Sequence, residues 1–400
     1  MSTTRWSTEC AMSSQVVTLG PIAHGGSCVA RLPGAGTGQV VFVRGGIPGE
    51  RVSVQLTDTS HATWWRGDVD DVIESSPDRV SPPCPLAGVC GGCDWQHMKL
   101  ERQRLCKAQI IEEQLERLAG VHVPDLVVTA VAGDHGGLGW RTRMRYQFSG
   151  GQVGLRAARS HDLVPLLQGG CSLATPKPTP DEIREAAQSS GGQSDIGVTV
   201  AQSGISIWQA GKGVINGRPI VTEQAGGRVY KVRADGFWQV HPGAADALSS
   251  LVRHWFSPVG GQVLDLYCGV GLFAGVLSDA GGVVHGIEIN KAAVELARQN
   301  VPAATFTVGA VEKVPWGQGP VDFVVVDPPR AGAGRAVVQR IARYRPQAVA
   351  YIACDPASLA RDVATFATVG YRVVDFAALD IFPMTSHVEC CALLSSHDPS

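Results

Sequence analysis

The last third of the chain alternates short apolar runs with longer stretches of helical length, and the first run ends in a glycine turn. Short β-rich runs separated by helices are typical of parallel strands that helices cover on both faces. After the first run comes Cys-Gly-Val-Gly at 268–271, where the glycines permit a tight turn and the next helix begins with unpaired N–H groups. We therefore predict a Rossmann-like α/β domain over residues 226–400. The four runs are residues 263–267, 283–289, 321–326 and 348–352.

The first part of the chain, residues 14–76, is predicted to form a small β-barrel. Two strand-like runs, 39–43 and 51–56, flank a turn that contains glycine and proline. No internal repeat at a solenoid period joins this segment to the rest of the chain.

Residues 77–225 are predicted to form a central α+β domain. It opens with a loop that contains three cysteines, followed by a helix over 100–119 that stops before Gly120. Strand-like patterns return from 140 to 209. We expect the helix to pack on the C-terminal domain.

Charge and hydropathy restrict the possible partners. The formal net charge is −2, so any basic surface for nucleic acid must be local. No apolar run approaches the ~20 residues needed to cross a bilayer, and residues 1–20 have no apolar stretch of signal-peptide length. We therefore expect a cytoplasmic protein with no membrane partner, and a monomer. The 11 cysteines of such a chain indicate a metal or catalysis before disulfides.

Two acidic residues follow predicted strands and favour a particular cofactor. Glu288 ends the second apolar run, where a carboxylate can accept hydrogen bonds from both ribose hydroxyls of an adenosine. This arrangement suits a dinucleotide as well as S-adenosylmethionine, because a Gly-x-Gly turn is a weak signal. An Asp-Pro-Pro-Arg loop begins at Asp327, after the third run, and such a loop is typical of methyltransferases. The sequence therefore favours S-adenosylmethionine.

Two motifs near the C-terminus resemble the two signatures of the RNA (uracil-C5)-methyltransferase family. Residues 327–332 with 349–358 resemble the first signature, and residues 379–389 resemble the second. Residues 25–30 and 42–50 resemble the TRAM domain, an RNA-binding barrel of the oligonucleotide-binding type. Together these similarities extend over nearly the whole chain.

The resemblance implies a role for several residues. Cys354 would be the nucleophile and Glu389 the base. The S-adenosylmethionine site would consist of Gln239, Tyr267, Glu288 and Asp327. The chain departs from the family at His241, Ala353, Asp355 and Met384, which stand where asparagine, serine, asparagine and a more polar residue are usual.

The implied pair matches the chemistry that methylation of uracil requires. Carbon 5 of uracil is a weak nucleophile, but a thiolate that adds to C6 creates an enolate with negative charge on C5. A base must then remove the C5 proton before the thiolate can leave. Methylation of cytosine C5 uses similar chemistry, yet its nucleophile normally lies in the loop that is Asp-Pro-Pro-Arg here. A non-catalytic iron–sulfur RNA-binding protein is the alternative of another class.

Three cysteines form a C-x5-C-x2-C motif at Cys84, Cys90 and Cys93. Three thiolates on one glycine-containing loop can surround a soft metal centre, and the residue types fit zinc as well as an iron–sulfur cluster. The resemblance to the 23S ribosomal-RNA branch of the family implies a 4Fe-4S cluster with Cys171 as the fourth ligand.

RNA is the expected partner. Arg141, Arg143 and Arg145 alternate along a predicted strand, which places three guanidinium groups on one face for phosphate contact. The expected reaction is methylation of C5 of a uridine, with ribosomal RNA favoured. Methylation of uridine 54 of transfer RNA by the same mechanism is the alternative.

Overall fold

The computed structural model describes residues 14–32, 38–133, 135–175, 178–188, 194–257, 260–317 and 319–396. The expectation that residues 1–20 contain no stretch of signal-peptide length falls largely on residues 1–13, which lie outside these ranges. Within the described ranges, no helix combines the length and the apolar character that crossing a membrane requires.

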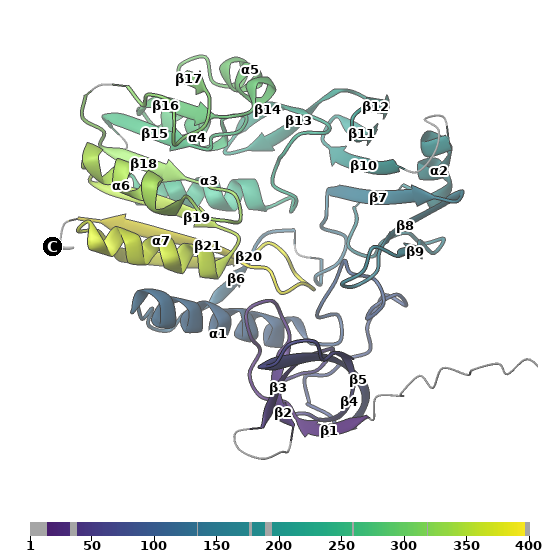
Figure 1. The fold of residues 1–400 in the computed structure, drawn as a ribbon. Coiled ribbons are helices and arrows are strands. Elements are labelled where there is room, and N and C mark those ends of the chain that lie inside the picture. Colours follow the sequence, from purple (N-terminus) through teal and green to yellow (C-terminus); the bar gives the residue numbers. More distant parts are fainter. Residues whose placement is uncertain are drawn as a thin grey trace, which may run out of the picture.

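The N-terminal segment forms a curled five-stranded sheet at the bottom of Figure 1. Its strand order is β1-β4-β5-β3-β2, so β1 and β2 are the edge strands of the expected barrel. Alternating burial along β4 sends Val52, Val54 and Leu56 into its core. The strands are β1 (Gln15–Thr18), β2 (Cys28–Leu32), β3 (Gln39–Arg44), β4 (Arg51–Asp58) and β5 (Trp64–Glu74).

The central segment forms a six-stranded sheet of order β12-β11-β10-β7-β8-β9, with a short helix against it. A two-stranded hairpin follows and leads toward the C-terminal part (Figure 1). The elements are β7 (Arg143–Ser149), β8 (Gln152–Arg156), β9 (Leu163–Pro165), α2 (Pro180–Gln188), β10 (Ser194–Ala201), β11 (Gly204–Gln209), β12 (Gly213–Asn216), β13 (Ile220–Ala225) and β14 (Arg228–Arg233).

The C-terminal part is built on an eight-stranded sheet of order β17-β16-β15-β18-β19-β21-β20-β6. Strands β17, β16, β15, β18 and β19 are parallel, and β21 runs antiparallel between β19 and β20. The α/β domain and its four predicted parallel strands are confirmed. The strands are β6 (Val128–Ala130), β15 (Gln262–Leu266), β16 (Val283–Glu288), β17 (Thr305–Val308), β18 (Phe323–Val326), β19 (Ala348–Ala353), β20 (Arg372–Asp380) and β21 (Glu389–Ser395).

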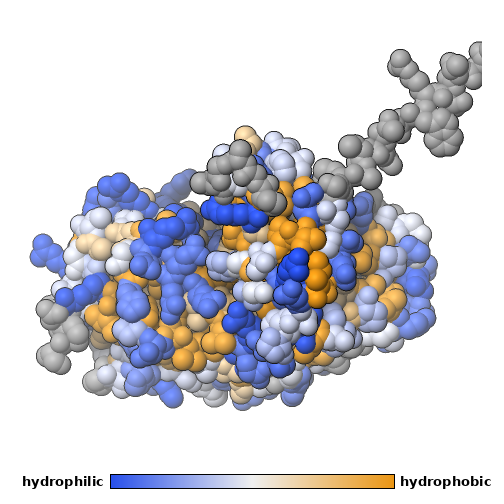
Figure 2. Space-filling model, turned by 90° about the horizontal axis from the view of Figure 1, so that it is seen from below, coloured by the Kyte–Doolittle hydropathy of each residue, from blue (hydrophilic) through white to orange (hydrophobic). Residues whose placement is uncertain are grey.

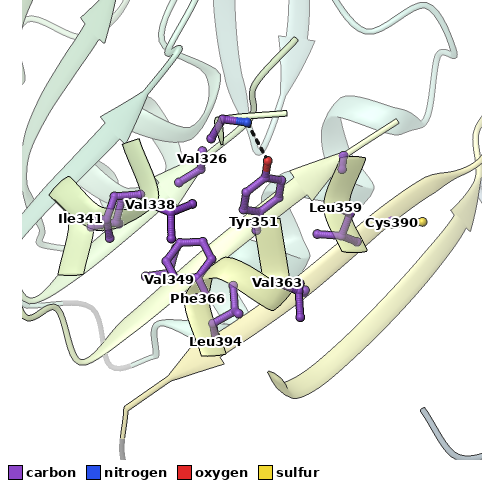
Figure 3. Packing of buried hydrophobic residues seen from close by; sticks show 14 of the residues in the cluster. Val326, Val338, Ile341, Val349, Tyr351, Leu359, Val363, Phe366, Cys390 and Leu394 are labelled. Atoms are coloured by element: carbon purple, nitrogen blue, oxygen red, sulfur yellow. Dashed lines mark hydrogen bonds between the residues drawn. The ribbon is translucent and has the colours of Figure 1, made fainter. Parts of the chain in front are cut away.

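Helices cover both faces of this sheet, and each face has its own buried apolar cluster. One cluster lies against α1, α6 and α7, and the other lies against α3, α4 and α5. Figure 3 shows the first cluster around Tyr351. The helices are α1 (Leu100–Ala119), α3 (Ala244–Trp255), α4 (Leu272–Asp279), α5 (Lys291–Asn300), α6 (Gly334–Tyr344) and α7 (Pro356–Thr368).

Helix α1 and strand β6 belong to the C-terminal layers, although both fall within the expected central domain 77–225. Helix α1 packs along α7 and ends at Gly120, which has the left-handed conformation with φ 63°. Strand β6 pairs in parallel with β20. The domain bounds 14–76, 77–225 and 226–400 stay a prediction.

On the side of the N-terminal sheet and α1, apolar patches lie between polar side chains (Figure 2).

Candidate active site

Five of the predicted site residues lie where the parallel strands of the C-terminal sheet have their carboxyl ends. Parallel strands end at the same edge, and Tyr267, Glu288, Asp327 and Cys354 each end or directly follow a parallel strand. Strand β21 runs the other way, so its first residue, Glu389, reaches that same edge. In open α/β folds, ligands bind beyond the carboxyl ends of the parallel strands, which is where these five residues lie.

Cys354 and Glu389 are neighbours across two antiparallel strands. Ala353, the last residue of β19, pairs with Cys390 of β21, so the next position on each strand joins Cys354 to Glu389. Burial raises the pKa of the Cys354 thiol to about 11, and the Glu389 carboxylate adds to the shift, while Arg330 acts in the opposite direction. The resting side chain is therefore a thiol at neutral pH, and it needs a further charge change to become a nucleophile.

Glu389 is a buried carboxylic acid, and the half-buried Asp327 acts on it electrostatically. Burial raises the pKa of Asp327 to about 7. Burial and the charge of Asp327 raise the pKa of Glu389 well above its usual value. Its surroundings therefore favour the protonated form of Glu389. A cation placed beside this pair would favour the ionised form that a base requires.

The glycine turn after β15 has the geometry of a ligand cradle. Tyr267, Gly269 and Gly271 have φ values of 63°, 54° and 90°, so the backbone passes through the left-handed region and then starts α4. The Glu288 carboxylate accepts hydrogen bonds from the N–H groups of Gly269 (3.1 Å) and Asn290 (2.7 Å). These contacts fix the acid that was predicted to bind ribose at the edge of the turn.

Asp265 is an acid of this site to which the sequence assigned no role. Its side chain is fully buried, and one carboxylate oxygen accepts from the N–H of Ala274 at 2.9 Å. The other oxygen has no hydrogen-bond partner among the described residues. The pKa of Asp265 is raised to about 8, mainly by burial and also by the Asp327 and Glu288 carboxylates, against the lowering effect of the Ala274 hydrogen bond. The signal was available, because Asp265 is the one charged residue of an apolar strand.

Gln239 comes from outside this row of strand ends. It is buried in the loop between β14 and α3, and the backbone oxygen of the next residue, Val240, accepts a hydrogen bond from Thr142 at 2.9 Å. Across the described ranges, no hydrogen bond ties the Gln239 side chain to the other five predicted site residues.

A buried network fixes the loop that begins at Asp327. Asp362 of α7 accepts hydrogen bonds from the Tyr351 hydroxyl (2.5 Å) and from the N–H groups of Ala333 (2.7 Å) and Gly334 (3.1 Å). The Tyr351 hydroxyl, which also carries a dashed line in Figure 3, accepts a hydrogen bond from the Ala333 N–H at 2.9 Å. The loop between β18 and α6 is therefore held by β19 and α7.

The N-terminal sheet also touches the nucleophile loop. His24 Nε2 lies 3.0 Å from a carboxylate oxygen of Asp355, which directly follows Cys354. The other Asp355 oxygen accepts from the Ser358 N–H at 2.7 Å and caps α7. Asp355, which stands where the family usually has asparagine, thus has a histidine partner from the N-terminal segment.

The four predicted metal-ligating cysteines are free thiols that act on one another electrostatically. Burial raises the pKa of Cys93 to about 12, and the thiols of Cys171, Cys90 and Cys84 add to this shift. Burial also raises the pKa of Cys90 and of Cys171. Over the part of the chain that the structure describes, no three histidine, cysteine or acidic side chains converge closely enough to hold a single metal ion.

The predicted row of arginines is corrected at one position. Arg143 Nη2 donates to Glu223 at 2.9 Å, and both side chains are largely buried, so this guanidinium does not face solvent. Arg145 is exposed, and its guanidinium lies 5.4 Å above the Trp208 ring. Sequence alternation alone could not reveal that Glu223, on a hairpin far along the chain, covers Arg143.

Comparisons with known proteins agree with this architecture. Residues 13–63 match the TRAM domain, residues 263–344 match a methyltransferase domain, and residues 317–397 match the tRNA (uracil-5-)-methyltransferase model. An uncharacterized RNA methyltransferase of Streptomyces avermitilis is 42% identical, and the alignment covers 94% of this chain and 97% of that protein.

Two further proteins are similar over nearly their full lengths. The 23S rRNA (uracil(1939)-C(5))-methyltransferase RlmD of Cronobacter sakazakii is 31% identical, over 89% of this chain and 91% of that protein. The tRNA (uracil-54, C5)-methyltransferase of Pyrococcus abyssi, solved with S-adenosyl-L-homocysteine, has the same fold with a TM-score of 0.71. It is 22% identical, and the match covers 96% of this chain and 100% of that one.

The parallel sheet, its glycine turn and the matching domain define an S-adenosylmethionine-dependent methyltransferase. An N-terminal TRAM domain joined to it narrows that class to enzymes that act on RNA. The chain belongs to the RNA (uracil-5-)-methyltransferase family, as its two C-terminal motifs predict.

Proposed function

We propose that the protein transfers a methyl group from S-adenosylmethionine to C5 of a uridine in 23S ribosomal RNA, through a covalent bond between Cys354 and C6. The adjacency of Cys354 and Glu389 at the strand ends carries this proposal, because the two chemical steps need a nucleophile and a base on one ring. Similarity to RlmD of Cronobacter sakazakii, together with the cysteine motif, favours ribosomal RNA over the transfer-RNA alternative.

The reaction proceeds in four steps. The Cys354 thiolate adds to C6, and the electron pair of the C5–C6 double bond moves into an enolate. C5 then attacks the methyl carbon, the carbon–sulfur bond of the sulfonium breaks, and S-adenosylhomocysteine leaves. Glu389 takes the C5 proton, the double bond re-forms, and the Cys354 thiolate departs.

The charges of the site support the proposal that these reaction steps depend on the bound methyl donor. Gln239, Tyr267, Glu288 and Asp327 would hold the donor, with Glu288 at its ribose and Asp327 near its cationic end. A sulfonium and an ammonium group beside Asp327 would stabilise that carboxylate in its ionised form. The same positive charge would offset the effect of the Asp327 carboxylate on Glu389, and would so favour the ionised Glu389 that accepts the C5 proton.

We further propose that Cys84, Cys90, Cys93 and Cys171 hold a 4Fe-4S cluster. Hydrogen bonds to sulfur support it, since thiolate ligands of such clusters are stabilised by N–H donors. Gln96 Nε2 donates to Cys93 Sγ (3.0 Å) and the Gly92 N–H points at Cys90 Sγ (3.4 Å). The N–H groups of Leu173 and Ala174 donate to Cys171.

The ligand set by itself suits zinc as well as a cluster. The resemblance of the C-x5-C-x2-C motif and Cys171 to the ribosomal-RNA branch of the family is what favours the cluster. The cluster would serve structure or RNA positioning, because the methyl transfer moves no electrons to a metal.

The covalent mechanism is tested with RNA that contains 5-fluorouridine. Fluorine cannot leave C5 as a cation, so a methylated adduct should persist with the wild-type protein and S-adenosylmethionine and vanish in Cys354→Ala. Cys28→Ala is the matched control, because Cys28 is a buried thiol in the core of the N-terminal sheet, away from the strand ends. An adduct that survives in Cys354→Ala, or none with any RNA, would contradict the mechanism.

The RNA substrate is tested by mapping 5-methyluridine in ribosomal and transfer RNA of a deletion strain. Loss of a single ribosomal site, restored by the wild-type gene but not by Cys354→Ala, is expected. Loss restricted to transfer RNA would favour the alternative substrate. Iron and acid-labile sulfide, measured on anaerobically purified protein and on Cys171→Ser, test the cluster.

A further inference from the structure

The segment that leads into Glu389 contains a strained turn. Met384 has φ 65°, a left-handed conformation that a non-glycine residue seldom adopts. Such residues persist only where surrounding contacts hold them, and they gather at functional sites. Met384 lies five residues before Glu389, in the segment between β20 and β21, so the path of this turn sets where β21 begins.

Every polar group of Met384 is held by residues from the central segment. The N–H groups of Asp94 and Trp95 both donate to the Met384 carbonyl oxygen, at 3.0 and 3.1 Å. The Met384 N–H donates to Gln103 Oε1 at 2.9 Å, and Gln103 Nε2 lies 3.3 Å from the Met384 sulfur. Gln103 is fully buried on α1, and its amide also donates to the backbone oxygens of Trp95 and Met98.

Hydrogen bonds also hold the residues on either side of Met384. Asp94 Oδ2 accepts from both the N–H and the hydroxyl of Ser386, each at 3.1 Å. On the other side, buried Lys107 donates to Asp380 (2.6 Å) and to the Phe382 carbonyl oxygen (3.0 Å). Residues 94–107 thus contact the segment 380–386 along its length.

These contacts connect the cysteine loop to the candidate base. Asp94 directly follows Cys93, and the side chains of Cys93 and Cys171 pack in the same apolar cluster as Met384. A displacement of Cys93 would move Asp94 and release Ser386, three residues before Glu389.

We propose that Asp94 and Gln103 are positioning residues: they hold the Met384–Ser386 turn, aim the Glu389 carboxylate at the C5 proton, and link that aim to the state of the four-cysteine loop. This inference rests on the proposed function, because it assigns the turn a role in the proton-removal step. It also gives the cysteine loop a role in a reaction that needs no redox chemistry.

The test separates the two halves of the reaction on ordinary uridine RNA. A misplaced base slows only proton removal, so thiolate addition and methyl transfer still proceed and the methylated covalent adduct accumulates. For Asp94→Ala we expect adduct to accumulate while release of 5-methyluridine falls by roughly 10- to 100-fold. Asp94→Asn keeps an oxygen that can accept from Ser386, so it should restore most of the release rate. Glu113→Ala removes an exposed carboxylate of α1 and is the matched control.

A second measurement reports the turn itself. Hydrogen exchange of the full-length protein should be faster in residues 381–389 of Asp94→Ala, while the amides of β19 keep their protection. Cys93→Ser should give the same local change and the same adduct. If Asp94→Ala does not fold, Ser386→Ala removes one of the two hydrogen bonds and should give a smaller effect of the same kind.

Specific results would overturn the inference. They are an unchanged release rate in Asp94→Ala, or a parallel fall of adduct formation and release, which a general folding defect would cause. Unaltered exchange of residues 381–389 in Cys93→Ser would overturn the link to the cysteine loop. Failure of the wild-type protein to form an adduct with 5-fluorouridine RNA would instead contradict the proposed function, so the two failures are distinguishable.

Discussion

Cys354 and Glu389 occupy facing positions at the open ends of β19 and β21, one residue beyond the pair Ala353 and Cys390. Glu389 opposes ionisation of Cys354, because a negative charge on Glu389 raises the pKa of the thiol. The surroundings of the two groups thus favour a thiol and a protonated carboxyl, whereas the mechanism needs a thiolate and a carboxylate. Binding of a cationic donor and of RNA must therefore favour ionisation of Cys354 and Glu389.

Replacement of Glu389 by glutamine should trap the reaction after methyl transfer. Glutamine has nearly the same shape but cannot accept the C5 proton, so elimination of Cys354 stops. We expect the release of 5-methyluridine to fall by about 10²- to 10⁴-fold, the usual contribution of a general base. A covalent protein–RNA band on a denaturing gel, formed with ordinary uridine RNA, is the measurement. Normal release with no such band would show that another group takes the proton.

The reactivity of Cys354 should rise with pH and depend on Arg330. The pKa of the thiol is about 11, and Arg330 lowers it against the effects of burial and of Glu389. In Arg330→Met the thiol pKa should rise further, so alkylation of Cys354 at pH 8 should slow. Arg330→Lys keeps the charge and should alkylate at nearly the wild-type rate. The rate of modification by iodoacetamide, followed by mass spectrometry of the Cys354 peptide, checks this. Equal rates in Arg330→Met and the wild-type protein would exclude a contribution from Arg330.

The sequence predicted those features that depend on local patterns. Short apolar runs and the glycine turn located the parallel strands, and Gly120 marked the end of α1. Helix α2 was missed, although its start carries a capping box in which Thr179 and Glu182 bond each other's backbone N–H groups.

Other features depend on contacts between distant parts of the chain. Strand β6 has only three residues, and it pairs with a strand nearly 250 positions away, so no local period reveals it. The same is true of the ion pair between Arg143 and Glu223 and of the hydrogen bond from Met384 to Gln103, because each joins residues that only the packing of the chain brings together. The motifs identified Cys354 and Glu389, but only the register of β19 and β21 shows that they face each other.

The contact between His24 and Asp355 should contribute little to stability. Their side chains are 40% and 25% exposed, and pairs of this kind contribute roughly 0–1 kcal/mol. We expect His24→Ala to lower the free energy of unfolding by less than about 1 kcal/mol. Asp355→Ala should lower it by about 1 kcal/mol more, because α7 also loses its cap. Asp355→Asn retains a capping oxygen and should stay close to the wild-type protein. Chemical denaturation measures the differences, and a larger loss in His24→Ala than in Asp355→Ala would contradict this ranking.

Asp327→Asn should make the ligand-free protein more stable at alkaline pH while it removes activity. Burial raises the pKa of Asp327 from its ordinary value to about 7 in the folded protein. Between these two values the folded state binds more protons than the unfolded state, so the stabilising effect of the raised pKa is complete at acidic pH and is lost as the pH rises to about 7. Above that pH the folded protein buries a charge beside Glu389, which asparagine does not carry.

We therefore expect the free energy of unfolding of Asp327→Asn to exceed that of the wild-type protein by about 1–3 kcal/mol at pH 8, with a smaller difference at pH 5. Thermal unfolding at the two pH values, without S-adenosylmethionine, measures this difference. Asp322→Asn is the control, because Asp322 lies at the opposite end of β18, near the start of the strand. A gain in stability that is equal at both pH values would mean that packing, and not the buried charge, distinguishes the variant. Addition of S-adenosylmethionine should reverse the order at pH 8, since a cationic donor stabilises only the protein that keeps the Asp327 carboxylate.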